Sequence, residues 1–131
     1  SFVIGVDVFE GKNVDIVCGA QELKFRKEFF DVIISTECFE HNPFYKETII
    51  NALRMLKPGG LFMFTCATTG RPEHGTSVHE AWASLTTKIG LDYYKNLTEE
   101  DIRKAITPEK EFSEFSFAVN KHDLYFYGIK K

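Results

Sequence analysis

The chain has 131 residues, of which 44% are hydrophobic and 27% are charged, and its net charge is -3 at pH 7. This balance is typical of a globular chain with a core, and the length fits one domain over residues 1–131 but not two. A negative chain disfavours a binder of nucleic-acid backbones, which carries a basic patch, and no apolar run approaches the ~20 residues of a membrane span. We therefore expect neither a nucleic-acid nor a membrane partner.

The cysteines bear on the cellular compartment of the protein, and the N-terminal residues bear on the extent of the domain. Cys18, Cys38 and Cys66 are an odd number of thiols without the spacing of a metal site. We expect a reduced, cytoplasmic compartment, with the thiols as small apolar fillers; a redox or nucleophilic role is the alternative. The first residues are not typical of a signal peptide and already predict a strand, so we expect the domain to be partial, with upstream residues missing.

The first third of the chain predicts three strands. Residues 2–8 are an almost continuous apolar run, interrupted by Gly5 and Asp7, as in a buried parallel strand. Residues 14–18 predict a short second strand. Residues 30–35 follow a polar connection and predict a third strand, which is strongly apolar.

A helix and a fourth strand complete a βαβ unit. Residues 44–57 have apolar side chains at helical spacing, which predicts an amphipathic helix. Pro58 and Gly59 end this helix, and residues 61–66 predict the next strand. Polar residues directly after the strand of residues 30–35 lie at its carboxyl end, which is where open α/β sheets bind ligands.

The second half begins with a long insertion and ends in a predicted hairpin. Residues 67–96 are weakly periodic, with one short helix predicted over residues 81–89, and loops of this length are usually functional or mobile. Thr98, with an acidic residue three positions later, predicts a capped helix that ends near Ile106. The last predicted elements are two strands over residues 111–119 and 124–129, joined by a hairpin-type connection. The whole order predicts an α/β fold with a mostly parallel sheet and a terminal antiparallel β-hairpin.

Four segments of the sequence, taken together, resemble a class I S-adenosylmethionine-dependent methyltransferase of the type 11 kind. These segments are residues 3–7, 14–23, 30–34 and 56–60, and the pairing of the last two is specific. The resemblance covers residues 2–69 well and continues more loosely through the helix after Thr98 and the terminal hairpin. It implies a Rossmann-like methyltransferase sheet and S-adenosylmethionine as the cofactor.

The resemblance also implies which residues bind the adenosine half of this cofactor. Asp7 would bind the ribose diol, and Val8 would lie beside the adenine. Gly19, Ala20 and Gln21 would lie at the adenine edge. The family often has an aspartate near this point, and Gln21 can replace its hydrogen bond.

The methionine half of the cofactor would pass over the loop formed by Ser35, Thr36 and Glu37. The family also has a first strand with a glycine-rich turn, which this sequence does not contain, and that strand would lie between the strand of Asp7 and the strand of Phe30. A gap there exposes strand edges, so we expect either another segment or chain in the gap, or direct pairing in a rearranged sheet. One expected outcome is a homo-oligomer that forms through the open sheet. A second outcome to test is that the chain, without the glycine-rich turn, does not bind S-adenosylmethionine.

Two histidines are candidates for the chemical step. His41 follows the third strand and His74 follows the fourth, so both are expected at the carboxyl edge of the sheet. A histidine with a pKa near neutrality suits a general base for an oxygen or nitrogen nucleophile; a purely structural role is the alternative for each. His79 and His122 are expected at the surface. We expect no metal site, because the histidines lack a metal-binding spacing.

Aromatic side chains of the insertion have two interpretations. Trp82, Tyr93 and Tyr94 are candidates for a lid over a substrate, but residues of this kind more often belong to a core.

Three functions remain open at this stage. The first is a methyltransferase acting on a small molecule or another acceptor. The second is a non-catalytic interaction module that has lost its cofactor loop. The third is a nicotinamide-dependent Rossmann enzyme, for which the sequence contains no dinucleotide glycine motif.

Overall fold

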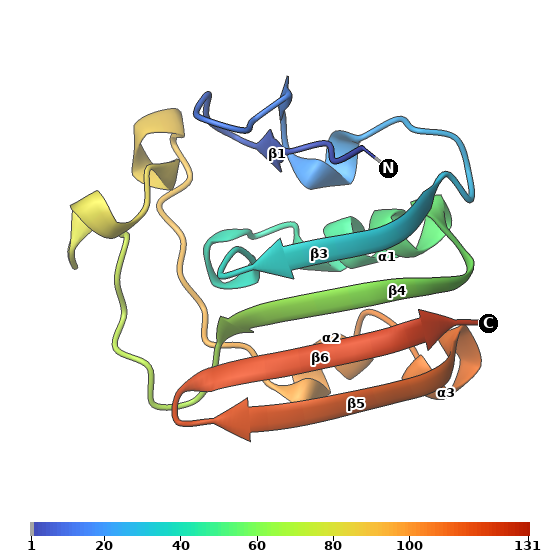
Figure 1. Ribbon diagram of the computed structural model, residues 1–131. Coiled ribbons are helices and arrows are strands. Elements are labelled where there is room, and N and C mark those ends of the chain that lie inside the picture. The colour runs from blue at the N-terminus through green and yellow to red at the C-terminus, as the bar shows by residue number, and fades with distance from the viewer. Residues whose placement is uncertain (1) are drawn as a thin grey trace.

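A computed structural model describes residues 2–131 (Figure 1). The strands are β1 (Val6–Asp7), β2 (Ile16–Val17), β3 (Phe30–Thr36), β4 (Leu56–Ala67), β5 (Phe112–Asn120) and β6 (Asp123–Lys130). The α-helices are α1 (Tyr45–Met55), α2 (Glu99–Arg103) and α3 (Pro108–Glu111). Four short 3₁₀ helices are η1 (Ala20–Glu22), η2 (Phe39–His41), η3 (Ala81–Ala83) and η4 (Thr86–Ile89).

Within the described residues, the strands form two separate sheets. β1 and β2 pair in parallel, and the second sheet has the order β3-β4-β6-β5. β3 and β4 are parallel, whereas β6 runs antiparallel to both β4 and β5. The predicted Rossmann-like α/β fold with a terminal antiparallel hairpin is confirmed, with two parallel and two antiparallel strand pairs over residues 2–131.

The gap predicted between the strand of Asp7 and the strand of Phe30 is present in this part of the chain. Among residues 2–131, β1 pairs only with β2, and β3 pairs only with β4. In Figure 1, β1 lies alongside β3 without a strand between them. Each of these two strands therefore has one edge whose backbone groups are not used by the sheet.

The predicted βαβ unit is present as β3, α1 and β4, but its last strand begins earlier than residue 61. The two-residue step from Phe30 to Val32 is matched by the five-residue step from Leu56 to Leu61. Gly59, at φ 75°, lies in this irregular stretch, where L side chains are disfavoured. The prolyl-glycine segment is thus a bulge at the start of β4 and not a turn that precedes the strand.

The core lies on one face of the larger sheet. Ile49 of α1 and Ile102 of α2 are fully buried in one cluster with Phe62, Phe64 and Phe126. The rings of Phe64 and Phe126 stack with their centroids 5.1 Å apart. Each such side chain contributes about 1.5–3 kcal/mol by leaving water, so this cluster holds the helices on the sheet.

The opposite face of the sheet is not covered by these helices. Figure 1 shows α1 and α2 on the far side of the sheet, so that the near side has no helix over it. Val32 and Ile34 of β3 are 49% and 55% exposed, and Tyr125 and Tyr127 of β6 are 40% and 37% exposed. A strand as apolar as β3 is usually buried on both faces, so this band is an unusual feature of the described chain.

The capping box predicted at Thr98 is confirmed. The Asp101 backbone N–H donates to Thr98 Oγ1, and the Asp101 carboxylate accepts a hydrogen bond from the Thr98 backbone N–H at 3.1 Å. This reciprocal pair satisfies two N–H groups at the start of α2 that have no partner inside the helix.

Three further predicted elements differ from the structure. The first strand is limited to Val6–Asp7, and the second to Ile16–Val17. The single helix predicted over residues 81–89 is instead the two 3₁₀ helices η3 and η4, because Ser84 between them is extended, with φ -143° and ψ 140°.

Across the described residues, no helix combines the length and the apolar character needed to cross a membrane. The three cysteines are free thiols in this part of the chain.

Candidate functional site

The carboxyl ends of β1, β3 and β4 lie at the same edge of the molecule, on the left of Figure 1. The thiol of Cys38, just after β3, reports on the charges there. The Cys38 residue as a whole is exposed, but its sulfur is shielded from water. This burial is the largest cause, followed by the charges of Glu40 and Asp7, that raises the pKa of the Cys38 thiol to about 11. The Asp7 carboxylate at the end of β1 is therefore close to the loop that follows β3, although the two strands belong to separate sheets.

Asp7 is exposed at the end of β1 and already has a local role. Its Oδ1 accepts a hydrogen bond from the backbone N–H of Phe9 at 3.0 Å, which closes a turn. This bond orients the carboxylate beside Val8, which is half-buried. Asp7 thus combines a structural contact with a carboxylate that solvent reaches.

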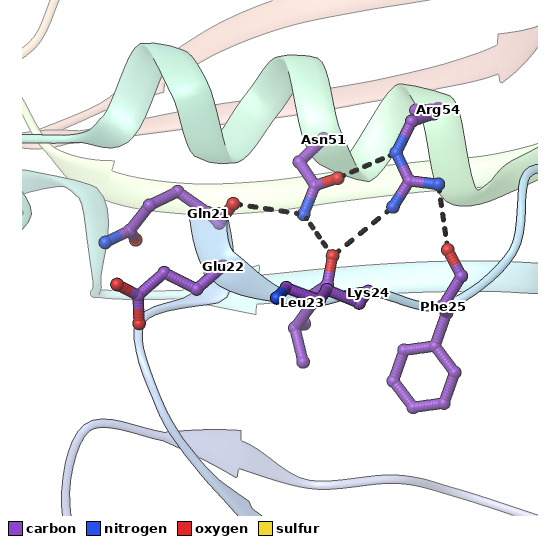
Figure 2. Close-up of a pocket in the computed structure, with 7 residues that line it drawn as sticks. All are labelled: Gln21, Glu22, Leu23, Lys24, Phe25, Asn51 and Arg54. Atoms are coloured by element: carbon purple, nitrogen blue, oxygen red, sulfur yellow. Dashed lines mark hydrogen bonds between the residues drawn. The ribbon is translucent and has the colours of Figure 1, made fainter.

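Residues 20–25 are positioned by α1, and Figure 2 shows the contacts of residues 21–25. The Asn51 side-chain amide donates to the backbone carbonyls of Ala20, Gln21 and Leu23 at 3.1, 3.4 and 3.0 Å. Arg54 donates to the carbonyl of Phe25 at 2.8 Å. A single helix face therefore holds η1 and the segment after it in one conformation.

Gly19 allows the chain to pack closely at this point. A Cβ at Gly19 would lie 2.4 Å from Nε2 of Gln21, so the amide of Gln21 occupies the space that a larger residue would need. Gly19, Ala20 and Gln21 accordingly form one compact unit at the end of β2.

A shallow hollow of about 710 Å³ lies along the same segment. Its lining is formed by Gln21, Glu22, Leu23, Lys24, Phe25, Asn51 and Arg54. The hydrogen bonds drawn in Figure 2 already engage three carbonyl groups there, those of Gln21, Leu23 and Phe25. Neither candidate histidine lines this hollow. We therefore interpret it as the region where α1 holds residues 20–25 in place, and not as the location of a chemical step.

The loop after β3 leaves the sheet sharply. The backbone N–H of Glu37 donates to the carbonyl of Thr65 at 2.9 Å, and Glu37 itself has the left-handed φ of 48°. Such a conformation costs about 1–3 kcal/mol in a residue other than glycine, and it is typical of functional loops. Ser35 is half-buried, whereas Thr36 and Glu37 are exposed at the sheet edge.

Beyond this turn, η2 buries two polar residues next to each other. Glu40 has no exposed surface, and His41 is 8% exposed. The backbone N–H of Lys95 donates to the Glu40 carbonyl at 2.8 Å, which ties the insertion to η2.

The insertion also brings His74 to the same place. The ring centroids of His41 and His74 are 4.9 Å apart, and the Tyr94 ring is 5.5 Å from the first and 4.9 Å from the second. At Gly75, φ is +66°, and a Cβ there would lie 2.8 Å from Cε1 of His41. The absence of a side chain at Gly75 is therefore what lets this loop pack on His41.

Burial sets the protonation of this cluster. Burial is the largest influence on Glu40 and, with the nearby charge of Glu37, raises its pKa to about 7. Burial also lowers the pKa of His41, and the His74 imidazole adds to this effect, against the opposing charge of Glu37. His41 is consequently a neutral imidazole at neutral pH, with a lone pair available.

The other aromatic and histidine candidates differ in their exposure to solvent. His79 and His122 are exposed, and Trp82 is 79% exposed. Tyr93 and Tyr94 are half-buried, and the Tyr94 ring lies against the cluster.

Glu40 is the residue that the sequence reasoning missed. Its only signal is its place next to His41 and three residues after Glu37. Such a short polar run does not reveal that the carboxylate is buried. The catalytic roles suggested for His41 and His74 stay predictions, as do the cofactor roles of the residues at the strand ends.

The model of a family described as "Methyltransferase domain" matches residues 5–64. This range contains β1, β2, β3 and most of β4, with the strand-end residues Asp7, Gly19 and Glu37. No curated protein matches the sequence.

Solved structures with the same fold include one of a Pyrococcus horikoshii OT3 protein, with a TM-score of 0.66, 15% identity, and coverage of 98% of this chain and 73% of that one. A Burkholderia thailandensis 1,6-didemethyltoxoflavin-N1-methyltransferase, solved with 1,6-didemethyltoxoflavin and S-adenosylhomocysteine, has a TM-score of 0.60, 18% identity, and 95% and 59% coverage.

An S-adenosylmethionine-dependent methyltransferase of Thermotoga maritima has a TM-score of 0.59, 17% identity, and 91% and 65% coverage. The chain thus spans 59–73% of the lengths of these three structures.

Proposed function

We propose that the chain is a class I S-adenosylmethionine-dependent methyltransferase of the type 11 kind, which binds S-adenosylmethionine and transfers the methyl group to a small molecule. The match of residues 5–64 to a methyltransferase domain carries this proposal. The Burkholderia thailandensis structure, which holds a small acceptor and S-adenosylhomocysteine, supports a small-molecule acceptor.

In this proposal, the adenosine half of the cofactor lies across the ends of β1 and β2. The exposed carboxylate of Asp7 accepts hydrogen bonds from the ribose hydroxyls. Val8 packs beside the adenine, and Gln21 reaches its edge. The bonds from Asn51 to residues 20–23 support this assignment, because a fixed backbone loses little freedom when a ligand binds.

The methionine half and the acceptor lie toward the loop of Ser35, Thr36 and Glu37. His41 and His74 stand beyond this loop, at the carboxyl edge of the parallel strands. A neutral His41 can accept a proton from an oxygen or nitrogen nucleophile as its bond to the methyl carbon forms. Positioning and removal of water supply much of the acceleration in an in-line methyl transfer.

Calorimetric titration with S-adenosylhomocysteine tests the proposal. We expect a single site in the wild-type chain and binding weakened by tenfold or more in Asp7→Asn, since a hydrogen bond to a charged group is worth about 1.5–3 kcal/mol. Asp31→Asn is the matched control, because Asp31 is an exposed aspartate near the opposite end of β3 that pairs with Lys57. Absence of binding, both by this chain and by one extended upstream, would contradict the proposal.

A second function, a non-catalytic interaction module, is favoured by the open sheet. Within residues 2–131, β1 and β3 each have an unpaired edge, which offers backbone contacts to another chain, and the exposed side chains of Val32 and Ile34 offer apolar contacts. Light scattering separates the two functions. A stable oligomer that does not bind S-adenosylhomocysteine supports the module, whereas a monomer that binds it supports the enzyme.

A further inference from the structure

Glu40 is buried in a way that the methyltransferase proposal does not explain. Neither carboxylate oxygen has a hydrogen-bond partner within residues 2–131, although the side chain has no exposed surface. Nearly all buried polar groups in folded proteins are paired, and an unpaired buried carboxylate is especially unfavourable. Such a group indicates that a partner is to be supplied from outside the chain.

A second buried atom beside Glu40 has the same property. Nδ1 of His41 is inaccessible and has no hydrogen-bond partner in the described residues. Two neighbouring residues thus present three unpartnered acceptor or donor atoms at one point in the interior. The insertion closes on this point through the contact between Lys95 and the carbonyl of Glu40.

We propose that Glu40, His41 and His74 bind one divalent first-row transition-metal ion, with Zn²⁺ as its representative. Each of the three residues has a ligand atom, and these atoms all lie within 4.8 Å of one another. Ligand atoms around a tetrahedral zinc at about 2.0–2.2 Å are about 3.4 Å apart, so shifts of about 1 Å close the site.

The donor types favour this class of ion over magnesium or calcium. Two imidazoles and one carboxylate are typical ligands for Zn²⁺, Mn²⁺, Fe²⁺ and Co²⁺, whereas Mg²⁺ and Ca²⁺ prefer sites built from oxygen alone. The ion would also neutralise the buried Glu40 carboxylate, whose oxygens have no hydrogen-bond partner among residues 2–131.

His74 is oriented as a metal-binding histidine would be. Its Nδ1 lies 3.0 Å from the carbonyl oxygen of Pro72. With the proton on Nδ1 and donated to this carbonyl, the lone pair is on Nε2, which is the usual arrangement of a histidine ligand and its supporting hydrogen bond. Glu37 lies near the cluster, and its charge acts on both Glu40 and His41.

The sequence spacing could not predict this site, because its ligands come from two distant loops. Glu40 and His41 lie in η2, whereas His74 is in the insertion after β4. The site does not depend on the proposed cofactor. An ion bound at His41 would occupy the imidazole lone pair, so the general-base role proposed for His41 applies only to the metal-free chain.

The test is titration of the full, tag-free chain with Zn²⁺ alone by calorimetry, and with Co²⁺ alone by visible absorption. We expect one equivalent of each ion to bind. We also expect a higher melting temperature with Zn²⁺, because an ion that binds only the folded chain stabilises it. The absorption of bound Co²⁺ reports its coordination directly and needs no activity.

Three variants and one control decide the assignment. Glu40→Gln, His41→Ala and His74→Ala should each weaken Zn²⁺ binding on the order of 100-fold, because even supporting residues around a metal cost 10–100-fold when removed. His122→Ala removes an exposed histidine outside the cluster and should leave binding unchanged. Circular dichroism checks that each variant is folded. If the Glu40 or His41 variant does not fold, His74→Ala decides the test, because His74 is a half-buried loop residue.

Two results would overturn the proposal. One is no saturable binding of either ion by the folded wild-type chain. The other is binding that His74→Ala and Glu40→Gln leave within threefold of wild type, which would assign the ion to surface residues.

Discussion

Replacing Asp101 with asparagine tests how the segment over the candidate site is held in place. Asp101 is 8% exposed, and its Oδ2 accepts hydrogen bonds from the Thr98 backbone N–H at 3.1 Å and the Thr98 hydroxyl at 3.0 Å. Its Oδ1 accepts from Lys95 Nζ at 2.8 Å. Lys95 in turn donates its backbone N–H to the carbonyl of Glu40. The Asp101 carboxylate therefore fixes both α2 and the segment around Lys95, which lies beside η2.

The expected loss follows from these contacts. Capping interactions are typically worth about 1 kcal/mol. The ion pair adds at most about 1 kcal/mol, because the Lys95 side chain is 45% exposed and solvent screens it. We therefore expect Asp101→Asn to lower the free energy of unfolding by about 2 kcal/mol at pH 7.

The same substitution should remove a pH dependence. Burial alone raises the pKa of Asp101, but the hydrogen bonds from Lys95 and Thr98 outweigh it, so the net pKa is lowered. A lowered carboxyl pKa stabilises the folded state above the unfolded value of about 3.9, and this stability is lost as the pH falls through the folded value. The difference between wild type and Asp101→Asn should thus be full at pH 7 and shrink below about pH 4.

Urea unfolding followed by circular dichroism at pH 7, 5 and 3 measures this difference. Glu100→Gln is the matched control, since its side chain is 80% exposed and its pair with Lys104 should contribute under about 0.5 kcal/mol. A loss at Asp101 below about 0.5 kcal/mol, or one that is the same at every pH, would refute the reasoning.

Three further substitutions test other contacts. Asn51→Ala removes the donor to three carbonyls of residues 20–23 and should lower stability by about 1–3 kcal/mol in urea unfolding, and weaken S-adenosylhomocysteine binding; an unchanged midpoint would contradict this role. Gly128→Ala places a Cβ 2.5 Å from the Phe112 ring and should cost about 1–3 kcal/mol by the same measurement, whereas a neutral result would mean that the ring moves freely. Gly75→Ala puts a Cβ 2.8 Å from His41 at a positive φ, and we expect Zn²⁺ affinity to fall at least about tenfold in calorimetry; equal affinity would show that the loop does not position the site.

The parts of the fold that the sequence predicts well are those with strong local patterns. Helix α1 has apolar residues at helical spacing, and the capping box at Thr98 is a local arrangement of two side chains, so both could be read without tertiary information. The bulge before Leu61 is different, because it depends on the register between β3 and β4, which only pairing decides. The same holds for residues 81–89, where an extended Ser84 interrupts a weakly periodic segment.

The candidate site likewise contains residues whose position local sequence predicts and residues whose position depends on tertiary contacts. Asp7 and Glu37 could be placed at one edge of the sheet from the strand pattern alone, because carboxyl ends of parallel strands share an edge. Glu40 could not be recognised, since neither its burial nor its nearness to His74 is a property of local sequence. Those two facts depend on the long insertion folding back over η2, a contact that spans more than thirty residues.

The position of β6 has a consequence for how the chain folds during synthesis. β6 lies between β4 and β5 in space, although the ribosome makes it after both. Until β6 has emerged, the buried aromatic residues of β4 have an unpaired edge beside them, and β5 has no strand to join. The same late segment also completes α1, because Lys130 Nζ donates to the carbonyls of Leu53 and Leu56 at 2.8 Å each. We expect nascent chains that stop before residue 123 to be prone to aggregation and dependent on chaperones. Cooperative folding is expected only once β6 is available.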